Sequence, residues 1–338
     1  MKYIYRFMAI FSVVLALSGC AGKKASRNAL LPNVSGKAGE IIVVIDRDSW
    51  EGDLGSGIRD LLASDCEYLA QREPLYSLAN VPQGNFNNMF KIHRNILIVN
   101  IDPQLQKEGM IYQQDKWARP QSVAQINAFE RTSAVAILKE NGEMIREFFE
   151  QAERGRIIAN SIKYEELSLR QPVEALTGGV IHFPSGYRLK KATDHFLWIA
   201  DEKQYTNQTV LIYKYPVTGD NPFTLENIIA KRNEIMKDNV PGMFENTYMT
   251  TSTAIEPTTV SKKYHGIEFM ETRGFWEVHG DFMGGPFVSH SFYSPDGKDI
   301  IVLEAFVFAP RYDKRQYLRQ VEALLYSFEW ETDEKDEK

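Results

Sequence analysis

Residues 274–297 read GFWEVHGDFMGGPFVSHSFYSPDG and place two runs of aromatic and β-branched residues on either side of a Gly-Gly-Pro sequence. Such runs predict β-strands, and the glycines between them predict a turn, so we expect an antiparallel hairpin. Similar runs come before and after it, and two helical patterns interrupt them. The stretch therefore predicts that the second half of the chain is an antiparallel sheet with helices packed against it.

The same hairpin contains side chains that a metal site would need. If the turn is centred on the two glycines, His279 faces His290, and Asp281 lies on the same face as His279. Two imidazoles and a carboxylate are a ligand set that zinc uses. A longer loop at Pro286, or a slip of one residue, separates the two histidines. A histidine pair packed inside the sheet is the structural alternative.

Aromatic residues are dense in this half of the chain. Exposed aromatic and arginine side chains are typical of binding surfaces, whereas buried ones belong to the core. The sequence cannot separate these two alternatives. As a possible binding face for a peptide, a glycan or a partner protein we select Arg273, Trp276, Phe282 and Tyr293.

Short catalytic motifs are missing from the sequence, which has no G-x-G-x-x-G, P-loop, H-E-x-x-H, G-x-S-x-G or C-x-x-C. Residues 52–57, GDLGSG, fit a capped turn better than a phosphate site, because no lysine follows and Asp53 would repel an anion. Ser289 and Ser291 lack the pattern of a nucleophile elbow. We therefore expect no cofactor and no enzymatic activity. The alternative is a metal-dependent hydrolase of an envelope substrate, built on the metal candidates His279, Asp281 and His290.

The chain begins MKYIYRFMAIFSVVLALSGC, in which Lys2 and Arg6 precede an apolar run at residues 7–17. This pattern is typical of a secretory signal peptide, and the run is shorter than the roughly 20 residues of a membrane-spanning helix. Residues 17–20, Leu-Ser-Gly-Cys, resemble the lipobox of bacterial lipoproteins, where cleavage leaves an acylated cysteine. We therefore predict a palmitate-type lipid anchor on Cys20.

The length of the chain and the helix breakers Pro172 and Gly178-Gly179 predict two domains of class α+β, each a mixed or antiparallel sheet packed against helices. The predicted parts are a lipoprotein signal peptide at 1–19, a lipidated tether at 20–36, an N-terminal α/β domain at 37–170 that ends in a long helix, a linker at 171–180, a C-terminal antiparallel-sheet α+β domain at 181–330, and an acidic tail at 331–338.

Hydrophobic patterns predict the strands and helices of the first domain. We expect strands at 39–46 and 95–101, where isoleucine and valine run without alternation. A helix at 58–69 would bury Cys66 as a structural thiol rather than a nucleophile. The pattern from about 132 to 168 predicts one very long helix, either unbroken or broken near Gly155.

The charge of the chain excludes one class of partner. The full sequence carries 39 basic and 45 acidic residues. Removal of residues 1–19 takes away Lys2 and Arg6 and no acid, which leaves 37 against 45 and a net charge of −8. A chain this acidic lacks the basic surface that nucleic acids require. We therefore expect no nucleic-acid partner.

Several segments resemble a known family. GKAGEIIVVID, HRNILIVNI, DFMGGPFVSHSFY and YLRQVEALLYSFEW, spread over residues 30–330, are similar to a family of Bacteroidota lipoproteins catalogued only as a domain of unknown function. That resemblance implies a lipoprotein of about this length and brings no activity, cofactor or catalytic residue. The order of elements in the second half also resembles the α/β/α sandwich of PsbP-type proteins.

The resemblance also bears on location. In that phylum, lipoproteins of the cell surface tend to have acidic residues just after the lipidated cysteine, whereas Ala-Gly-Lys-Lys follows Cys20 here. This implies a lipid anchor in the outer membrane that faces the periplasm. We expect a non-enzymatic binding or assembly component of the cell envelope. Its expected partners are the membrane, through Cys20, and an envelope protein, peptide or glycan.

Overall fold

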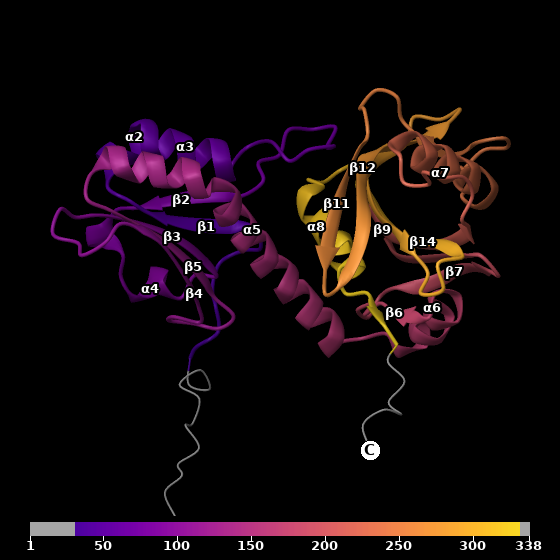
Figure 1. The fold of residues 1–338 in the computed structure, drawn as a ribbon, viewed down its shortest axis with the longest axis horizontal. Coiled ribbons are helices and arrows are strands. Elements are labelled where there is room, and N and C mark those ends of the chain that lie inside the picture. The colour runs from indigo at the N-terminus through magenta and orange to yellow at the C-terminus, as the bar shows by residue number, and fades with distance from the viewer. Residues whose placement is uncertain (1–30, 332–338) are drawn as a thin grey trace, which may run out of the picture.

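The computed structural model of the protein describes residues 31–331 and consists of two domains joined by one long helix (Figure 1). Each domain packs helices against a β-sheet, which confirms the predicted α+β class with two domains. The predictions for residues 1–30 and 332–338, among them the lipidation of Cys20, lie outside the described residues. None of the helices described is both long and apolar enough to cross a membrane.

The N-terminal domain is built on one five-stranded sheet. Its strands are β1 (Glu40–Val44), β2 (Ser77–Val81), β3 (Asn95–Ile101), β4 (Gly109–Gln114) and β5 (Ser122–Ala128). They lie in the order β2-β1-β3-β5-β4, and all pairs are parallel except β4 with β5. Both predicted strands of this domain are present, and their largely buried residues fit a parallel sheet that is covered on both faces.

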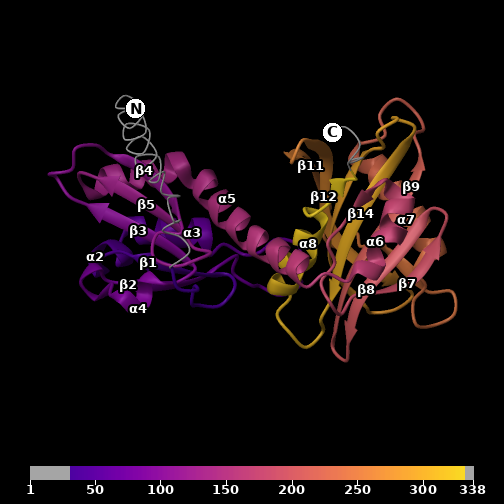
Figure 2. The same ribbon diagram turned by 90° about the horizontal axis from the view of Figure 1, so that it is seen from below.

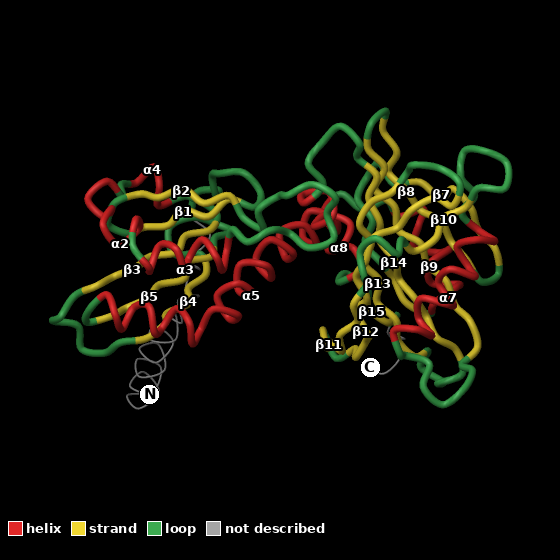
Figure 3. The backbone as a smooth tube through the Cα atoms, turned by 90° about the horizontal axis from the view of Figure 1, so that it is seen from above, coloured by secondary structure: helices red, strands yellow, loops and turns green. Residues whose placement is uncertain are grey.

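Two long helices cover one face of this sheet. The helices that the structure describes in this domain are α2 (Arg47–Glu51), α3 (Asp53–Leu62), α4 (Asn88–Lys91) and α5 (Arg131–Lys163), with a short 3-10 helix, η2 (Gln83–Asn85). Helices α3 and α5 lie side by side on the sheet (Figure 3). Ile58 of α3 and Phe149 of α5 are fully buried in the core that they form there.

Helix α5 is continuous over 33 residues, so the unbroken alternative of the prediction is correct. It ends at Lys163, before the predicted residue 168. Gly155 lies within it, although a glycine costs about 1 kcal/mol relative to alanine inside a helix. Packing outweighs that cost, because one end of the helix is buried in the N-terminal core and the other contacts helix α8 (Arg315–Leu325) of the second domain (Figure 2).

Cys66 does not lie on a helix, because α3 ends at Leu62 rather than at the predicted residue 69. After α3 the chain forms a loop, in which the amide of Cys66 donates a hydrogen bond to the carbonyl of Glu73 at 2.7 Å. The thiol is half-buried, and burial raises its pKa to about 11. A thiol that stays protonated at neutral pH is a poor nucleophile, in agreement with the structural role expected for it.

The predicted linker at 171–180 is wrong, since it contains helix α6 (Arg170–Thr177), which follows the 3-10 helix η3 (Leu167–Leu169). Pro172 lies in the first turn of α6, where a proline costs no hydrogen bond. Gly178 adopts the left-handed conformation, φ 76°, that commonly ends a helix. Val173 and Leu176 point into the core of the second domain. The residues taken for breakers are therefore the start and stop signals of a helix.

An antiparallel sheet of eight strands forms the C-terminal domain. Its strands are β7 (Arg188–Thr193), β8 (Phe196–Lys203), β9 (Thr206–Pro216), β10 (Tyr248–Thr251), β11 (Thr258–Tyr264), β12 (Ile267–His279), β13 (Gly284–Tyr293) and β14 (Asp299–Phe308). The order is β10-β12-β13-β14-β9-β8-β7, and β11 also pairs with β12. A separate two-stranded ribbon joins β6 (Gly179–Val180) to β15 (Glu329–Trp330).

Helices cover both faces of this sheet. Helices α6 and α8 bury one face, in a core that includes Val288 and Leu324. Helix α7 (Leu225–Asn239) packs on the opposite face, where Met236 meets Trp276. Helix α7 follows the cap Thr224, whose hydroxyl accepts a hydrogen bond from the amide of Asn227. The two faces of β12 thus lie in two different environments.

The two domains contact each other along helix α8. The buried carboxylate of Glu73, from the loop after α3, accepts hydrogen bonds from the amides of Lys314 at 2.7 Å and Arg315 at 2.8 Å. A carboxylate at this end of a helix is favoured by the helix dipole. One turn further on, Arg319 donates to Glu150 of α5 at 2.7 Å. Polar contacts therefore hold α8 to the N-terminal domain.

Candidate functional site

The turn between β12 and β13 is not centred on the two glycines, so the alternative that separates the two histidines is correct. The turn is formed by residues 278–283, and the two glycines lie within β13, where Gly284 pairs with Glu277. The reason is steric, because a Cβ on Gly285 would lie 2.2 Å from the carbonyl oxygen of Val307 and 3.0 Å from the indole nitrogen of Trp276. The glycines are needed for this close packing. The turn uses Gly280 instead, at φ 83°.

His279 and His290 are therefore not neighbours. His279 is exposed and pairs with Tyr248 of β10, with its ring stacked on the tyrosine at 4.9 Å. His290 is 3% exposed and pairs with Glu271, eight positions before His279. Asp281 lies in the turn, where its carboxylate accepts the amide of Phe282. Within residues 31–331 no group of three potential ligands is placed to hold a metal ion, so the proposed hydrolase loses its geometric basis.

The four residues selected as a binding face do not share one face. Trp276 is 2% exposed and belongs to the core beneath α7. Arg273 points to the opposite side of β12, where it donates to Glu322 of α8. Phe282 is fully exposed in the turn, and Tyr293 packs edge-on against Phe223 at 4.9 Å. Odd and even residues of a strand face opposite sides, which separates Arg273 from Trp276.

Around Glu271 the structure gathers a buried polar cluster that no sequence motif marked. Its carboxylate accepts hydrogen bonds from the Tyr326 hydroxyl at 2.7 Å and from Nε of Arg273 at 2.9 Å, and pairs with Lys262 at 3.0 Å. His290 lies 3.6 Å away. Burial by itself raises the pKa of Glu271, but the contact with His290 and the charge of Arg273 outweigh it and hold the pKa well below its usual range.

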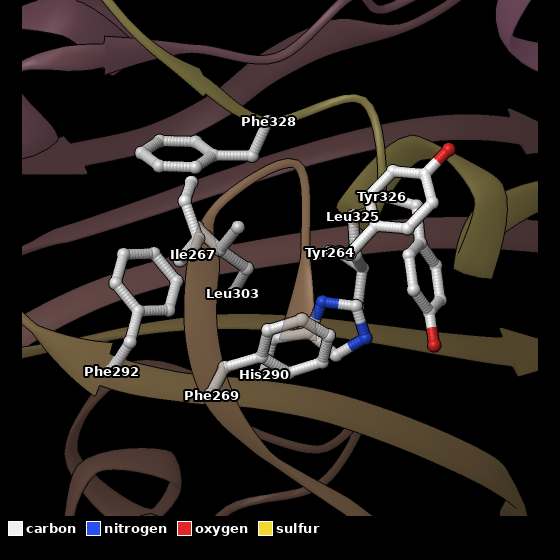
Figure 4. Close-up of a pocket in the computed structure, with 9 residues that line it drawn as sticks. All are labelled: Tyr264, Ile267, Phe269, His290, Phe292, Leu303, Leu325, Tyr326 and Phe328. Carbon is white, nitrogen blue, oxygen red and sulfur yellow. The ribbon is translucent and has the colours of Figure 1, made fainter. Parts of the chain in front are cut away.

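Figure 4 shows the other side of this cluster, a small cavity between His290 and a set of apolar rings. Phe269 stacks on the imidazole at 4.1 Å, and Tyr326 meets it edge-on at 4.6 Å. Burial lowers the pKa of His290, against the attraction of Glu271. The cavity measures about 20 Å³, which is room for one water molecule and for no ligand. We assign this cluster a structural role.

A larger apolar pocket opens on the α7 side of the C-terminal domain, with a volume of about 300 Å³. Its walls come from the sheet and from the two loops that follow α7 and β12. They include the side chains of Trp198, Met243, Met249, Trp276, Met283, Phe306 and Phe308. Aromatic walls with a few polar groups are typical of sites for small molecules. Methionines add walls that adapt to the shape of a ligand.

Polar groups are few in this pocket. The indole nitrogen of Trp276 is satisfied, because it donates to the carbonyl of Val307 at 3.3 Å. The indole nitrogen of Trp198 is buried and has no hydrogen-bond partner among residues 31–331. Glu202 and Asn207 lie at the edge and contact each other at 3.4 Å. The pocket is thus lined mainly by apolar side chains.

The mouth of the pocket exposes apolar side chains to water. Met243, which lines the pocket, is 77% exposed. Phe244, next to it in the sequence, is 62% exposed, and Phe282, next to the lining residue Met283, is fully exposed. The stacked pair of Tyr248 and His279 joins the two loops. Exposed apolar side chains gathered around an opening are typical of binding sites. This pocket is the candidate site, and of the residues selected from sequence it contains Trp276.

Two protein families match the chain, and together they cover most of the described residues. Residues 34–161 match the family described as "Domain of unknown function (DUF8532)", and residues 166–327 match "Domain of unknown function (DUF4837)". The division between them falls at the end of α5 and agrees with the two-domain layout. The expected resemblance to domains of unknown function is confirmed. Membership of a Bacteroidota lipoprotein family and the PsbP-type likeness stay predictions.

No curated protein matches the chain. Among solved structures, it is similar to LpqN of Mycobacterium tuberculosis, described as involved in cell envelope biogenesis, with 12% identity over 43% of this chain and 78% of that one and a TM-score of 0.27. The Ran-binding protein Mog1p of Saccharomyces cerevisiae has 8% identity over 45% and 90%, with a TM-score of 0.30. These likenesses are too distant to bear on function.

Proposed function

We propose that this protein is a lipoprotein of the cell envelope that binds the acyl chain of an envelope molecule in the apolar pocket of its C-terminal domain and catalyses no reaction. The observation that carries the proposal is the pocket itself, with its tryptophan and methionine walls and its apolar mouth. The lipobox-like sequence before Cys20 supports the location. We further propose that the anchor lies in the outer membrane and faces the periplasm.

An acyl chain suits the pocket for two reasons. The lining is apolar apart from Glu202 and Asn207, so the part of a ligand that enters must itself be largely apolar. Flexible methionine walls accommodate a flexible chain better than a rigid ring. A protein tethered to a bilayer also works where acyl chains are the most abundant apolar groups.

The anchor is tested by the substitution Cys20→Ala. Several acyl chains on one cysteine give stable membrane attachment, at about 0.8 kcal/mol for each buried CH₂ group. We expect the wild-type protein in the membrane fraction and the variant in the soluble fraction, with palmitate label incorporated only by the wild type. A variant that stays in the membrane fraction would show that another part of the chain makes the attachment.

The pocket is tested by the substitution Met243→Glu, in a full chain that also carries Cys20→Ala so that no acyl group of its own competes. A carboxylate at the mouth removes apolar contact and places a charge beside an acyl chain. We expect saturable binding of dansyl-labelled undecanoic acid to the parent chain, weakened at least about tenfold, or about 1.4 kcal/mol, by Met243→Glu. Fluorescence titration measures both affinities.

The matched control is Met89→Glu, because Met89 is 70% exposed and lies in α4 of the N-terminal domain. It adds the same charge to the chain without touching the pocket, so its affinity should equal that of the parent. Equal weakening by both substitutions, or the absence of saturable binding to the parent chain, would refute acyl binding at this pocket.

A further inference from the structure

A second and chemically different opening lies between the two domains. The residues that line it come from helix α5 on one side and from β11 and the end of α8 on the other. Figures 1 and 2 show that α5 runs from the N-terminal domain toward α8. The cleft has a volume of about 490 Å³, within the range of about 300–1,000 Å³ of ligand sites. Unlike the pocket beneath α7, it is lined mainly by charged side chains, with Tyr264 and Tyr326 at its floor.

Most of the charges in this cleft are paired. Arg146 contacts Glu143 on the same helix. Lys262 pairs with the buried Glu271 at 3.0 Å, and Lys263 pairs with Glu268 at 2.9 Å. The carboxylate of Glu150 forms an ion pair with Arg319 of α8 at 2.7 Å. These side chains have partners within the protein and need no ligand.

Arg154 is different. Its guanidinium stacks on the ring of Tyr326 at 3.6 Å and lies 5.8 Å from that of Tyr264, so its position is fixed. Yet among residues 31–331 it donates no hydrogen bond, and its nearest carboxylate, Glu322, is 3.9 Å away. That carboxylate already accepts two hydrogen bonds from Arg273. The face of the guanidinium thus stacks on a tyrosine ring, while its N–H groups are left without a hydrogen-bond acceptor. Such a group can bind an anion.

The balance of charge in the ion-pair network behind Arg154 and Lys262 points the same way. The cations of Arg154, Arg273 and Lys262 are set against only two carboxylates, Glu271 and Glu322. Within this network one positive charge is left over. The remaining carboxylate of the lining, Glu147, lies two helical turns, or about 10 Å, along α5 from Arg154.

We propose that Arg154 binds a carboxylate group of a ligand in this cleft, with the ring of Tyr264 as the adjoining apolar wall. A single excess charge matches a monoanion, and the planar guanidinium matches the two oxygens of a carboxylate. Glu143, Glu147 and Glu150 on the same wall oppose a more highly charged group such as phosphate. The site is independent of the acyl pocket, which lies on the other face of the sheet.

The test uses three probes that share one ring, namely benzoate, benzamide and phenyl phosphate. Each is titrated into the full chain carrying Cys20→Ala, and the side-chain N–H signal of Arg154 is followed by nuclear magnetic resonance. One charge-assisted pair at a partly exposed site supports a dissociation constant on the order of millimolar. We expect benzoate to bind with that affinity, phenyl phosphate more weakly, and benzamide without saturation.

The substitution Arg154→Gln should abolish benzoate binding, and Arg154→Lys should weaken it about tenfold because the planar fork is lost. Thermal unfolding shows whether each variant is folded, and the comparison of probes on the parent chain needs no variant. The control Arg146→Gln, in the same cleft but paired with Glu143, should change the affinity by about twofold at most. Equal affinity for benzamide, tighter binding of phenyl phosphate, or unchanged binding by Arg154→Gln would overturn the proposal.

Discussion

The substitution Arg232→Ala should lower the free energy of unfolding of the C-terminal domain by about 3–5 kcal/mol. Arg232 of α7 is 1% exposed, and its guanidinium contacts both carboxylate oxygens of Glu304 in β14, at 2.7 Å in the shortest contact. It also donates to Thr251 at 2.9 Å and lies over the ring of Phe287. Removal of the arginine leaves a carboxylate in the core without a counter-ion.

Chemical denaturation, read by the circular dichroism of the aromatic side chains, measures the loss. The double substitution Arg232→Met with Glu304→Leu is the informative control, because it removes both charges and keeps apolar volume. We expect it to be far more stable than the single variant. A loss below about 1 kcal/mol for Arg232→Ala would mean that water reaches Glu304, contrary to its full burial.

An effect of similar size is expected in the other domain for Glu153→Ala. Glu153 of α5 is fully buried and accepts hydrogen bonds from Arg94 at 3.0 Å, Asn95 at 2.7 Å and Arg156 at 3.1 Å. Burial lowers the pKa of Arg156 to about 10, and the charge of Glu153 opposes that shift. Without the carboxylate, two largely buried guanidinium groups repel each other, so we expect a loss of about 3–5 kcal/mol.

Hydrogen exchange resolves which domain is affected. Glu153→Ala should speed exchange of the five-stranded sheet, whereas Arg232→Ala should speed exchange of the eight-stranded one. Glu147→Ala, an exposed glutamate on the same helix, should change stability by no more than about 0.5 kcal/mol. Faster exchange of both sheets in each variant would mean that the α5–α8 contact makes the two domains one cooperative unit.

Periodicity predicted the elements of the fold well where one pattern dominates. The strand at 95–101 lies where predicted, because a continuous apolar run is a local signal. Helix α6 was missed since Pro172 and Gly178 were interpreted as breakers, although the first turn and the end of a helix are the places that accept them.

The candidate site could be predicted only in part, because it depends on strand register and on distant contacts. Gly284 and Gly285 suggested a turn, but they make room for Trp276, and no local pattern distinguishes these two uses. The resulting shift separates His279 from His290. Trp276 lines the pocket as a buried wall rather than as part of an exposed face.

Arg154 carries no sequence signal at all. It lies in a long amphipathic helix. Its candidate role as an anion site depends on Tyr326 and Glu322, which follow more than 160 positions later and contact Arg154 because α8 packs against α5. A single sequence contains no information on such a pairing. In contrast, the two methionines could have been noticed in the sequence. Met243 directly follows Pro241-Gly242, and Met283 directly precedes Gly284-Gly285.

Quenching of tryptophan fluorescence by a brominated fatty acid tests the central claim most directly, because bromine quenches only on contact and Trp198 and Trp276 form walls of the pocket. With the full chain carrying Cys20→Ala, we expect dibromostearate to quench to saturation at one molecule per chain, and stearate to compete. The substitution Trp198→Phe should remove a large part of the quenching while binding persists. Quenching that never saturates, or that is unchanged by Trp198→Phe, would contradict acyl binding in this pocket.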